Sequence, residues 1–274
     1  MIDTHVHVWR LGRNGCTWPS AADGPLHRDF VLDDYWATAG VCGIKEAILV
    51  QSQEAASDTE WLLEIAADDD RIAAVVGWAD IAGADAPRRV QALAACPKLA
   101  GLRPMVQHRP AGYYDDPDLA AGLAAVADAA LSLDALVREE HLPALGRLAA
   151  RLPLRIIVDH AAKPRIGDSN GLSAWRERIA PLADHDHVAV KLSGLLTECG
   201  GARQDAIVPY VDALIGLFGS DRVLWGSDWP VINAVSDYAA WQAQAVALVP
   251  QAAHDGIFSA NARRWYRLKS QVTA

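Results

Sequence analysis

Residues 2–9, Ile2-Asp3-Thr4-His5-Val6-His7-Val8-Trp9 or IDTHVHVW, place two imidazoles in an otherwise strand-like run. Side chains of a strand alternate between its two faces, so Asp3, His5 and His7 are predicted to share one face. Such a polar face occurs on an exposed edge strand or on a strand that faces a functional cavity. The remaining sequence favours the second interpretation.

The composition indicates a globular protein with one sizeable core. The chain has 274 residues, 51% of them hydrophobic, and a formal net charge of −9, with a pI near 5.4. This acidic balance argues against nucleic acid and against an anionic membrane as partners. The sequence has no cationic start followed by an apolar segment and no apolar run of about 18 residues, so neither a signal peptide nor a membrane span is predicted.

The four cysteines, Cys16, Cys42, Cys96 and Cys199, are scattered without a C-x-x-C pair. This spacing suits free thiols in a reducing compartment better than disulfides or a thiolate zinc site. We therefore expect a cytoplasmic protein, as a monomer or a small homo-oligomer.

Short apolar or β-branched runs alternate with helical stretches along the chain. Eight runs are predicted as strands: 2–8, 46–51, 73–78, 100–106, 132–136, 154–159, 188–192 and 222–226. Between them, apolar residues at i, i+3 and i+4 spacing predict helices that begin near residues 58, 86, 117, 141, 173, 205 and 236. Strands separated by helices form right-handed βαβ units with a parallel sheet.

Eight such units without a flexible linker predict a single α/β domain over residues 1–274, a closed (β/α)8 barrel of the TIM type. An open doubly wound sheet is the weaker alternative, because the sequence has neither G-x-G-x-x-G nor a P-loop. Residues 11–30 lack a regular period and are predicted to form a long active-site loop after the first strand.

Polar residues recur at the predicted carboxyl ends of the strands, where a barrel of this type places its active site. His5 and His7 come from the first strand, His160 follows the sixth and Asp228 follows the eighth. These groups are predicted either to bind one divalent metal ion, with zinc favoured, or to form a metal-free acid-base site in which Asp228 activates water.

Two cations are predicted in the interior of the barrel. Arg103 lies in GLRPMV and Lys191 lies in VAVKLSG. A charged side chain in a buried parallel strand is strongly unfavourable unless it is paired. Arg103 and Lys191 are therefore predicted to stabilise an oxyanion that forms in the site.

Other residues near the strand ends are weaker candidates. Gln51, His108 and Trp18 are predicted to contact substrate, from the second strand, the segment after the fourth and the 11–30 loop, respectively. Asp3 is a candidate for orienting an imidazole. Asp159 is predicted to face away from the site, because it directly precedes His160.

Five ordered motifs resemble the amidohydrolase superfamily, in particular its amidohydrolase-2 branch: IDTHVHVW, GLRPMVQ, VDHAAKP, VKLSGLLTE and VLWGSDWPV, followed by NARRWYRL. Within this branch the chain resembles sugar-acid lactonases of the L-fuconolactonase and L-rhamnonolactonase kind, from residue 1 to about residue 268. The resemblance implies a distorted (β/α)8 barrel that opens a lactone ring. It places the ligand or acid-base residues of the family on His5, His7, His160 and Asp228, and its substrate-contacting cations on Arg103 and Lys191.

Two departures limit what this resemblance implies. Many members of the superfamily bridge two metals with a modified lysine and two later histidines, whereas here only His160 is found, so a binuclear site is not expected. Many related lactonases read GIRH where this chain has Gly101-Leu102-Arg103-Pro104, which leaves the sugar open. Metal dependence differs within the branch, so the expected cofactor is one divalent ion or none.

The reaction implied is attack of water on the carbonyl of a small sugar lactone such as L-fucono- or L-rhamnonolactone. Asp228 would take the proton of the water, and Asp228 or His160 would return a proton to the leaving ring oxygen. Two alternatives stay open: a metal-dependent non-oxidative decarboxylase of the same superfamily, and a non-catalytic sugar-acid-binding barrel.

Overall fold

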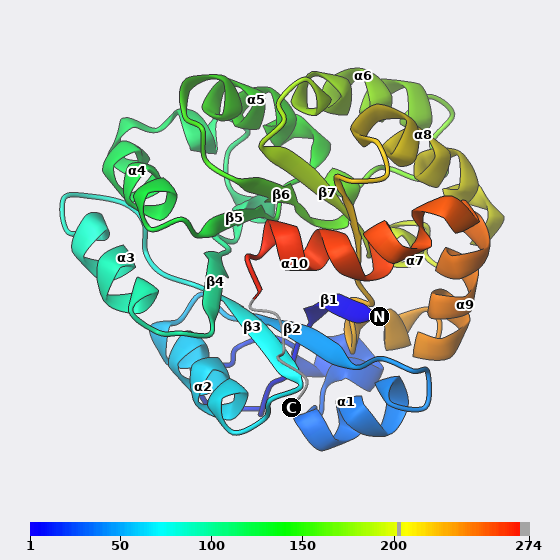
Figure 1. Ribbon diagram of the computed structural model, residues 1–274, viewed down its shortest axis with the longest axis horizontal. Helices are drawn as coiled ribbons and strands as arrows, with labels where there is room; N and C mark the ends of the chain where they lie inside the picture. The colour runs from blue at the N-terminus through cyan, green and yellow to red at the C-terminus, as the bar shows by residue number, and fades with distance from the viewer. Residues whose placement is uncertain (202–203, 269–274) are drawn as a thin grey trace.

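The computed structural model describes residues 1–201 and 204–268, and it confirms the predicted α/β barrel. Eight parallel strands are hydrogen-bonded in chain order, each to the next. They are β1 (Ile2–Val6), β2 (Glu46–Val50), β3 (Ile72–Gly77), β4 (Leu99–Leu102), β5 (Ser132–Ala135), β6 (Ile156–Val158), β7 (Val188–Leu192) and β8 (Val223–Trp225). The strands occupy the centre of the molecule and the longer helices surround them (Figure 1).

Helices follow the strands much as the apolar spacing predicts. They are α1 (Leu32–Ala39), α2 (Ala56–Ala67), α3 (Ala86–Ala94), α4 (Ala120–Asp128), α5 (Leu142–Arg151), α6 (Gly171–Ala183), α7 (Leu195–Glu198), α8 (Val208–Phe218), α9 (Tyr238–Leu248) and α10 (Asn261–Trp265). The sequence prediction lacks α1, α7 and α10. No described helix combines the length and the apolar character that a bilayer crossing requires.

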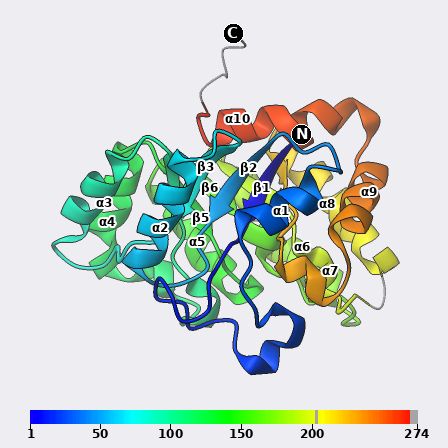
Figure 2. The same ribbon diagram turned by 90° about the horizontal axis from the view of Figure 1, so that it is seen from below.

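Two apolar layers hold the barrel together. One fills its interior with side chains such as Ile48, Val76 and Ala189, and the other lies between the strands and the surrounding helices. Trp265 and Tyr266, at the end of α10, belong to the interior layer. Figure 2 shows α10 across the end at which β1 begins, with the 11–30 segment at the opposite end. Polar groups therefore gather at the carboxyl ends of the strands, away from α10.

The barrel closes where β1 meets β8. The Thr4 hydroxyl donates to the carbonyl of Trp225 at 2.7 Å, and the backbone N–H of Asp228 donates to the carbonyl of His5 at 3.0 Å. A Cβ on Gly226 would lie 2.7 Å from the Cβ of His5, so glycine permits the two strands to approach this closely. The closure thus brings the first and last strands together beside the histidine pair.

The predicted alternation of β1 is wrong for Asp3. The register of β1 against β2 shifts between Asp3 and Val6, which inserts one extra residue into β1. As a result Asp3 accepts hydrogen bonds from the hydroxyls of Tyr35 in α1 and Tyr238 in α9, at 3.1 and 3.0 Å, while His5 points into the barrel. The Asp3 carboxylate also accepts from the backbone N–H groups of His5 and Ser227, so it ties the barrel closure together.

Candidate active site

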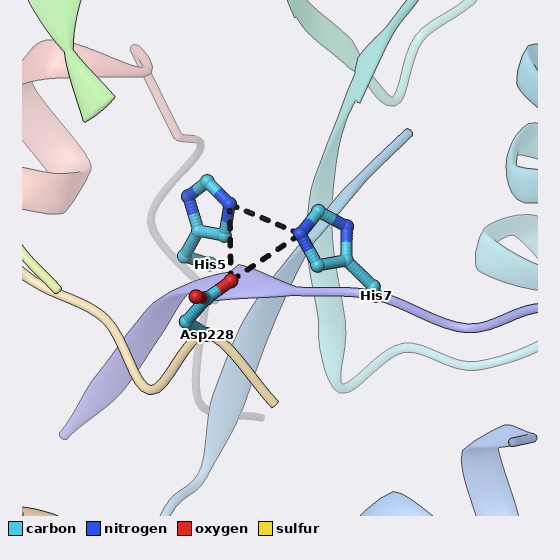
Figure 3. Close-up of side chains that lie close together, drawn as sticks. All are labelled: His5, His7 and Asp228. Atoms are coloured by element: carbon cyan, nitrogen blue, oxygen red, sulfur yellow. Dashed lines mark hydrogen bonds and ion pairs between the residues drawn. The ribbon is translucent and has the colours of Figure 1, made fainter. Parts of the chain in front are cut away.

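Three imidazoles meet one carboxylate at the carboxyl end of the barrel. The Oδ1 of Asp228 lies 3.5 Å from the Nε2 of His7, 3.8 Å from that of His5 and 3.9 Å from that of His160. The Nε2 atoms of His5 and His7 are 3.2 Å apart. Figure 3 shows these two rings and the carboxylate pointing toward one another. All four side chains are almost completely buried, so the predicted convergence of these residues is present.

Unusual backbone conformations direct two of these side chains. Residues 160–163 all have positive φ, between 51° and 62°, and Asp228 has φ 60°, a region that non-glycine residues adopt rarely. A Cβ on Gly194 would lie 2.6 Å from the Nδ1 of His160, and Gly194 itself has φ 67°. Only glycine therefore leaves space for the His160 ring at this position.

Hydrogen bonds fix the Nδ1 atoms of His7 and His160, which lie on the side of each ring away from Asp228. The Nδ1 of His7 is 2.8 Å from the carbonyl oxygen of Val50, and the Nδ1 of His160 is 2.9 Å from the hydroxyl of Ser193. A carbonyl can only accept, so His7 carries a proton on Nδ1 and directs its Nε2 toward Asp228. Contacts of this kind set the orientation and the tautomer of a functional histidine.

A layer of buried charges lies between these imidazoles and the base of the barrel. The Nζ of Lys191 is 2.7 Å from Oδ2 of Asp134, 3.0 Å from Oδ1 of Asp159 and 3.1 Å from Nδ1 of His5. The Nη1 of Arg103 is 3.5 Å from Oδ2 of Asp159 and 3.4 Å from Nε2 of His5. Two carboxylates therefore balance the two cations in the interior, as burial of charge requires.

Two expectations about this layer are corrected. The predicted outward direction of Asp159 is wrong, because the left-handed backbone that begins at His160 breaks the strand alternation and both side chains face inward. The placement of Lys191 gives no support to direct contact with an oxyanion. Its side chain is fully buried, and its ammonium contacts Asp134, Asp159 and His5.

The three predicted substrate contacts occupy different settings. Gln51 is buried and donates to the backbone carbonyl of Arg103 at 2.8 Å, and its Oε1 has no hydrogen-bond partner among the described residues. Trp18 is half-buried and packs edge-to-face on Trp9 at 5.2 Å. His108 is exposed at the end of a 3-10 turn. Their contact with substrate stays a prediction.

The electrostatics of the site favour an ionised Asp228 beside neutral forms of His5 and His160. Burial alone would raise the pKa of Asp228, but His160, His7 and His5 outweigh it and hold the pKa below its ordinary value. Burial, partly opposed by Asp228, lowers the pKa of His160 to about 4. Burial and then Lys191 hold the pKa of His5 well below its ordinary value. At neutral pH the site thus contains a carboxylate base next to the neutral imidazoles of His5 and His160.

The separations in the site fit a divalent metal ion. A tetrahedral ion with bonds of about 2.0–2.1 Å holds its ligand atoms about 3.3 Å apart. The three atoms of His5, His7 and Asp228 are 3.2, 3.5 and 3.8 Å apart, and they form a candidate metal-ligand group. These residues could therefore hold one divalent ion.

A barrel with a histidine pair at the carboxyl end of β1 and an aspartate after β8 is the arrangement of an amidohydrolase. The chain belongs to this family, because the family model described as amidohydrolase matches residues 2–268. The expected resemblance is thus confirmed.

Two curated relatives carry the same name. A protein from Burkholderia ambifaria named L-fucono-1,5-lactonase is 39% identical over 279 residues, which covers 97% of this chain and 95% of the relative. A protein of the same name from Burkholderia multivorans is 35% identical and covers 86% of this chain and 84% of the relative.

A solved structure supports the assignment of the chain to the amidohydrolase family. An amidohydrolase from Burkholderia multivorans with bound zinc has a TM-score of 0.90 and 32% sequence identity to this chain. The match covers 98% of this chain and 99% of that chain.

Sequence reasoning missed three residues that support the site. Ser193 anchors His160, Asp134 pairs with Lys191, and the Tyr266 hydroxyl donates to the same Oδ2 of Asp134 at 2.5 Å. The need for a counter-ion to Lys191 could have indicated Asp134, since SLDA places a carboxylate in a fully buried strand. Nothing in the local sequence indicates that Tyr266 reaches it from the far end of the barrel.

Proposed function

We propose that this protein is a carboxylic-ester hydrolase that opens the lactone ring of a sugar acid. The observation that carries the proposal is the ionised Asp228, which faces the Nε2 atoms of three imidazoles within 3.9 Å. The L-fucono-1,5-lactonases that cover nearly the whole chain support a sugar-acid lactone as substrate. An L-fucono-type lactone is therefore the first compound to test.

In the proposed mechanism Asp228 takes a proton from water as the water oxygen bonds to the lactone carbonyl carbon. The carbonyl oxygen becomes an oxyanion, and the tetrahedral intermediate then breaks the bond to the ring oxygen. Asp228 returns this proton to that oxygen, directly or through His160, and the oxygen leaves as a hydroxyl. The product is an open-chain hydroxy acid, and the base is restored.

Arg103 is the proposed cation nearest to the developing oxyanion. It follows β4, is 2% exposed, and its guanidinium is held by Asp159 and by the backbone carbonyl of Gln51. Fixed donors in a buried site stabilise charge without the cost of reorganising solvent. We assign Lys191 a positional role beneath His5.

A divalent ion is a proposed addition to this machinery, with zinc favoured because imidazole and carboxylate ligands suit it. An ion held by His5, His7 and Asp228 would polarise the carbonyl and make water more acidic. The zinc in the related Burkholderia multivorans structure supports this choice. We propose the cytoplasm as its location, in line with four cysteines that are all free.

A panel of sugar-acid lactones, followed with a pH indicator, tests the proposal. Ring opening releases one proton per turnover at neutral pH, so acidification with an L-fucono-type lactone is the expected result. Release of carbon dioxide from an aromatic acid by metal-loaded protein, without acidification by any lactone, would instead favour a decarboxylase. Thermal stabilisation by sugar acids without ring opening would favour a binding protein.

A further inference from the structure

His5 has a strong donor behind it, which fixes where its own proton can be. The Nζ of Lys191 lies 3.1 Å from the Nδ1 of His5, and an ammonium has three N–H donors and no lone pair. The ammonium also donates to Oδ2 of Asp134 at 2.7 Å and forms an ion pair with Oδ1 of Asp159 at 3.0 Å. Lys191 is fully buried, so no water competes for its hydrogens, and the Nδ1 of His5 is placed to accept one of them.

The two imidazoles of the histidine pair consequently have opposite proton patterns. A neutral His5 that accepts at Nδ1 carries its proton on Nε2. His7 donates from Nδ1 to the Val50 carbonyl at 2.8 Å, and a neutral His7 with this proton has a bare Nε2. The 3.2 Å contact between the two Nε2 atoms is then a hydrogen bond from His5 to His7. In this arrangement Lys191 donates to His5, His5 donates to His7, and His7 donates to the carbonyl of Val50.

We infer that Lys191 is a positioning residue that keeps the proton of His5 on Nε2 and so makes His5 a hydrogen-bond donor to the lactone carbonyl oxygen. This inference deepens the proposed function and rests on it. His7 and Asp228 then have the complementary task. Their facing Nε2 and Oδ1 atoms, 3.5 Å apart, are both acceptors, which suits the two hydrogens of the attacking water.

The other tautomer of His5 fits its surroundings less well. A proton on Nδ1 would be directed at Oδ1 of Asp159, 3.5 Å away, and would also meet the hydrogens of Lys191. The bare Nε2 would accept from Arg103 at 3.4 Å. Both contacts are longer than the 3.1 and 3.2 Å contacts of the first arrangement. A divalent ion on Nε2 of His5 requires this second tautomer, so Lys191 and the ion compete for the ring.

The position of Lys191 is in turn fixed from the base of the barrel. Oδ2 of Asp134 accepts from Lys191 and from the hydroxyl of Tyr266 at 2.5 Å, and Oδ1 accepts from Ser132 at 2.8 Å. A carboxylate with both oxygens occupied cannot rotate away from the ammonium. The donor behind His5 is therefore held by groups that are far from the substrate.

Nitrogen-15 NMR of the full chain labelled at histidine tests the inference directly. Long-range proton–nitrogen spectra at neutral pH, in the presence of chelator, distinguish the two tautomers of each ring, and His5→Asn and His7→Asn identify the signals. The expected result is a proton on Nε2 of His5 and on Nδ1 of His7. A proton on Nδ1 of His5, or a doubly protonated His5, would overturn the inference. The measurement uses wild-type protein and needs no lactone, so its outcome is independent of the ring-opening assay.

A Lys191→Met variant gives a second test, with Lys45→Met, an exposed site outside the machinery, as the matched control. If Lys191 sets the tautomer, kcat on the lactone should fall about 10²–10³-fold, as for loss of an oxyanion donor, while KM changes less than about threefold. Zinc affinity, measured by competition with a chromophoric chelator, should rise at least about tenfold. Unchanged or weaker zinc binding in a folded variant contradicts the inference. If the variant does not fold, the wild-type spectrum still decides.

Discussion

Acidification should destabilise the fold through His160, and the size of the effect follows from its burial. The pKa of this ring is lowered from 6.5 to about 4, mainly by burial. In the unfolded chain this ring therefore binds a proton below about pH 6.5, whereas in the folded protein it binds one only below about pH 4. Stability from this group is fully present above pH 6.5 and is lost as the pH falls toward 4. A shift of about 2.5 pKa units corresponds to about 3 kcal/mol.

Denaturant unfolding at a series of pH values between 7.5 and 4 measures this loss. Wild-type protein is expected to lose about 3 kcal/mol more than His160→Gln over this window, because glutamine removes the titrating group. His108→Gln, at an exposed histidine, is the control and should follow the wild type. Parallel curves for wild type and His160→Gln would refute the reasoning. The lowered pKa of Asp228 contributes only below its ordinary value near 3.8, outside this window.

Three further substitutions test the site and its support. Asp228→Asn should reduce kcat by about 10²–10⁴-fold with little change in KM, and an unchanged kcat in steady-state assays would remove Asp228 from the role of base. Gly194→Ala should lower activity at least about tenfold, because the new Cβ overlaps the His160 ring; full activity in the folded variant would mean that the ring can move without consequence. Tyr266→Phe removes a buried hydrogen bond to Asp134 and should lower the free energy of unfolding by about 2 kcal/mol. An unchanged midpoint of chemical denaturation would contradict this expectation.

The barrel could be predicted because its signal is local and repeated. Each strand is an apolar run and each outer helix shows apolar spacing, so the order of elements follows from short windows of sequence. The ends of elements were less predictable. The fourth strand ends at Leu102 but is predicted to extend to residue 106, because the apolar residues Pro104, Met105 and Val106 continue the composition of the strand into the segment that leads to a 3-10 turn.

The candidate site could be predicted only in part. His5, His7, His160 and Asp228 meet because parallel strand ends share one face of a barrel, which is a general property of the fold. The direction of Asp159 could not be predicted, since it depends on a left-handed turn formed by residues that are not glycine. The partners of Lys191 are also non-local: Asp134 lies 57 positions away in sequence, and no short pattern joins them.

The closure between β1 and β8 makes the histidine pair and Asp228 neighbours although they lie more than two hundred positions apart in the sequence. A partly folded molecule that has lost only this junction would keep most of its secondary structure and its hydrophobic layers, yet it would have no assembled set of acid-base groups. Turnover measured during mild denaturation should therefore disappear ahead of the circular dichroism signal, and the gap between the two curves would report how independently the ring can open.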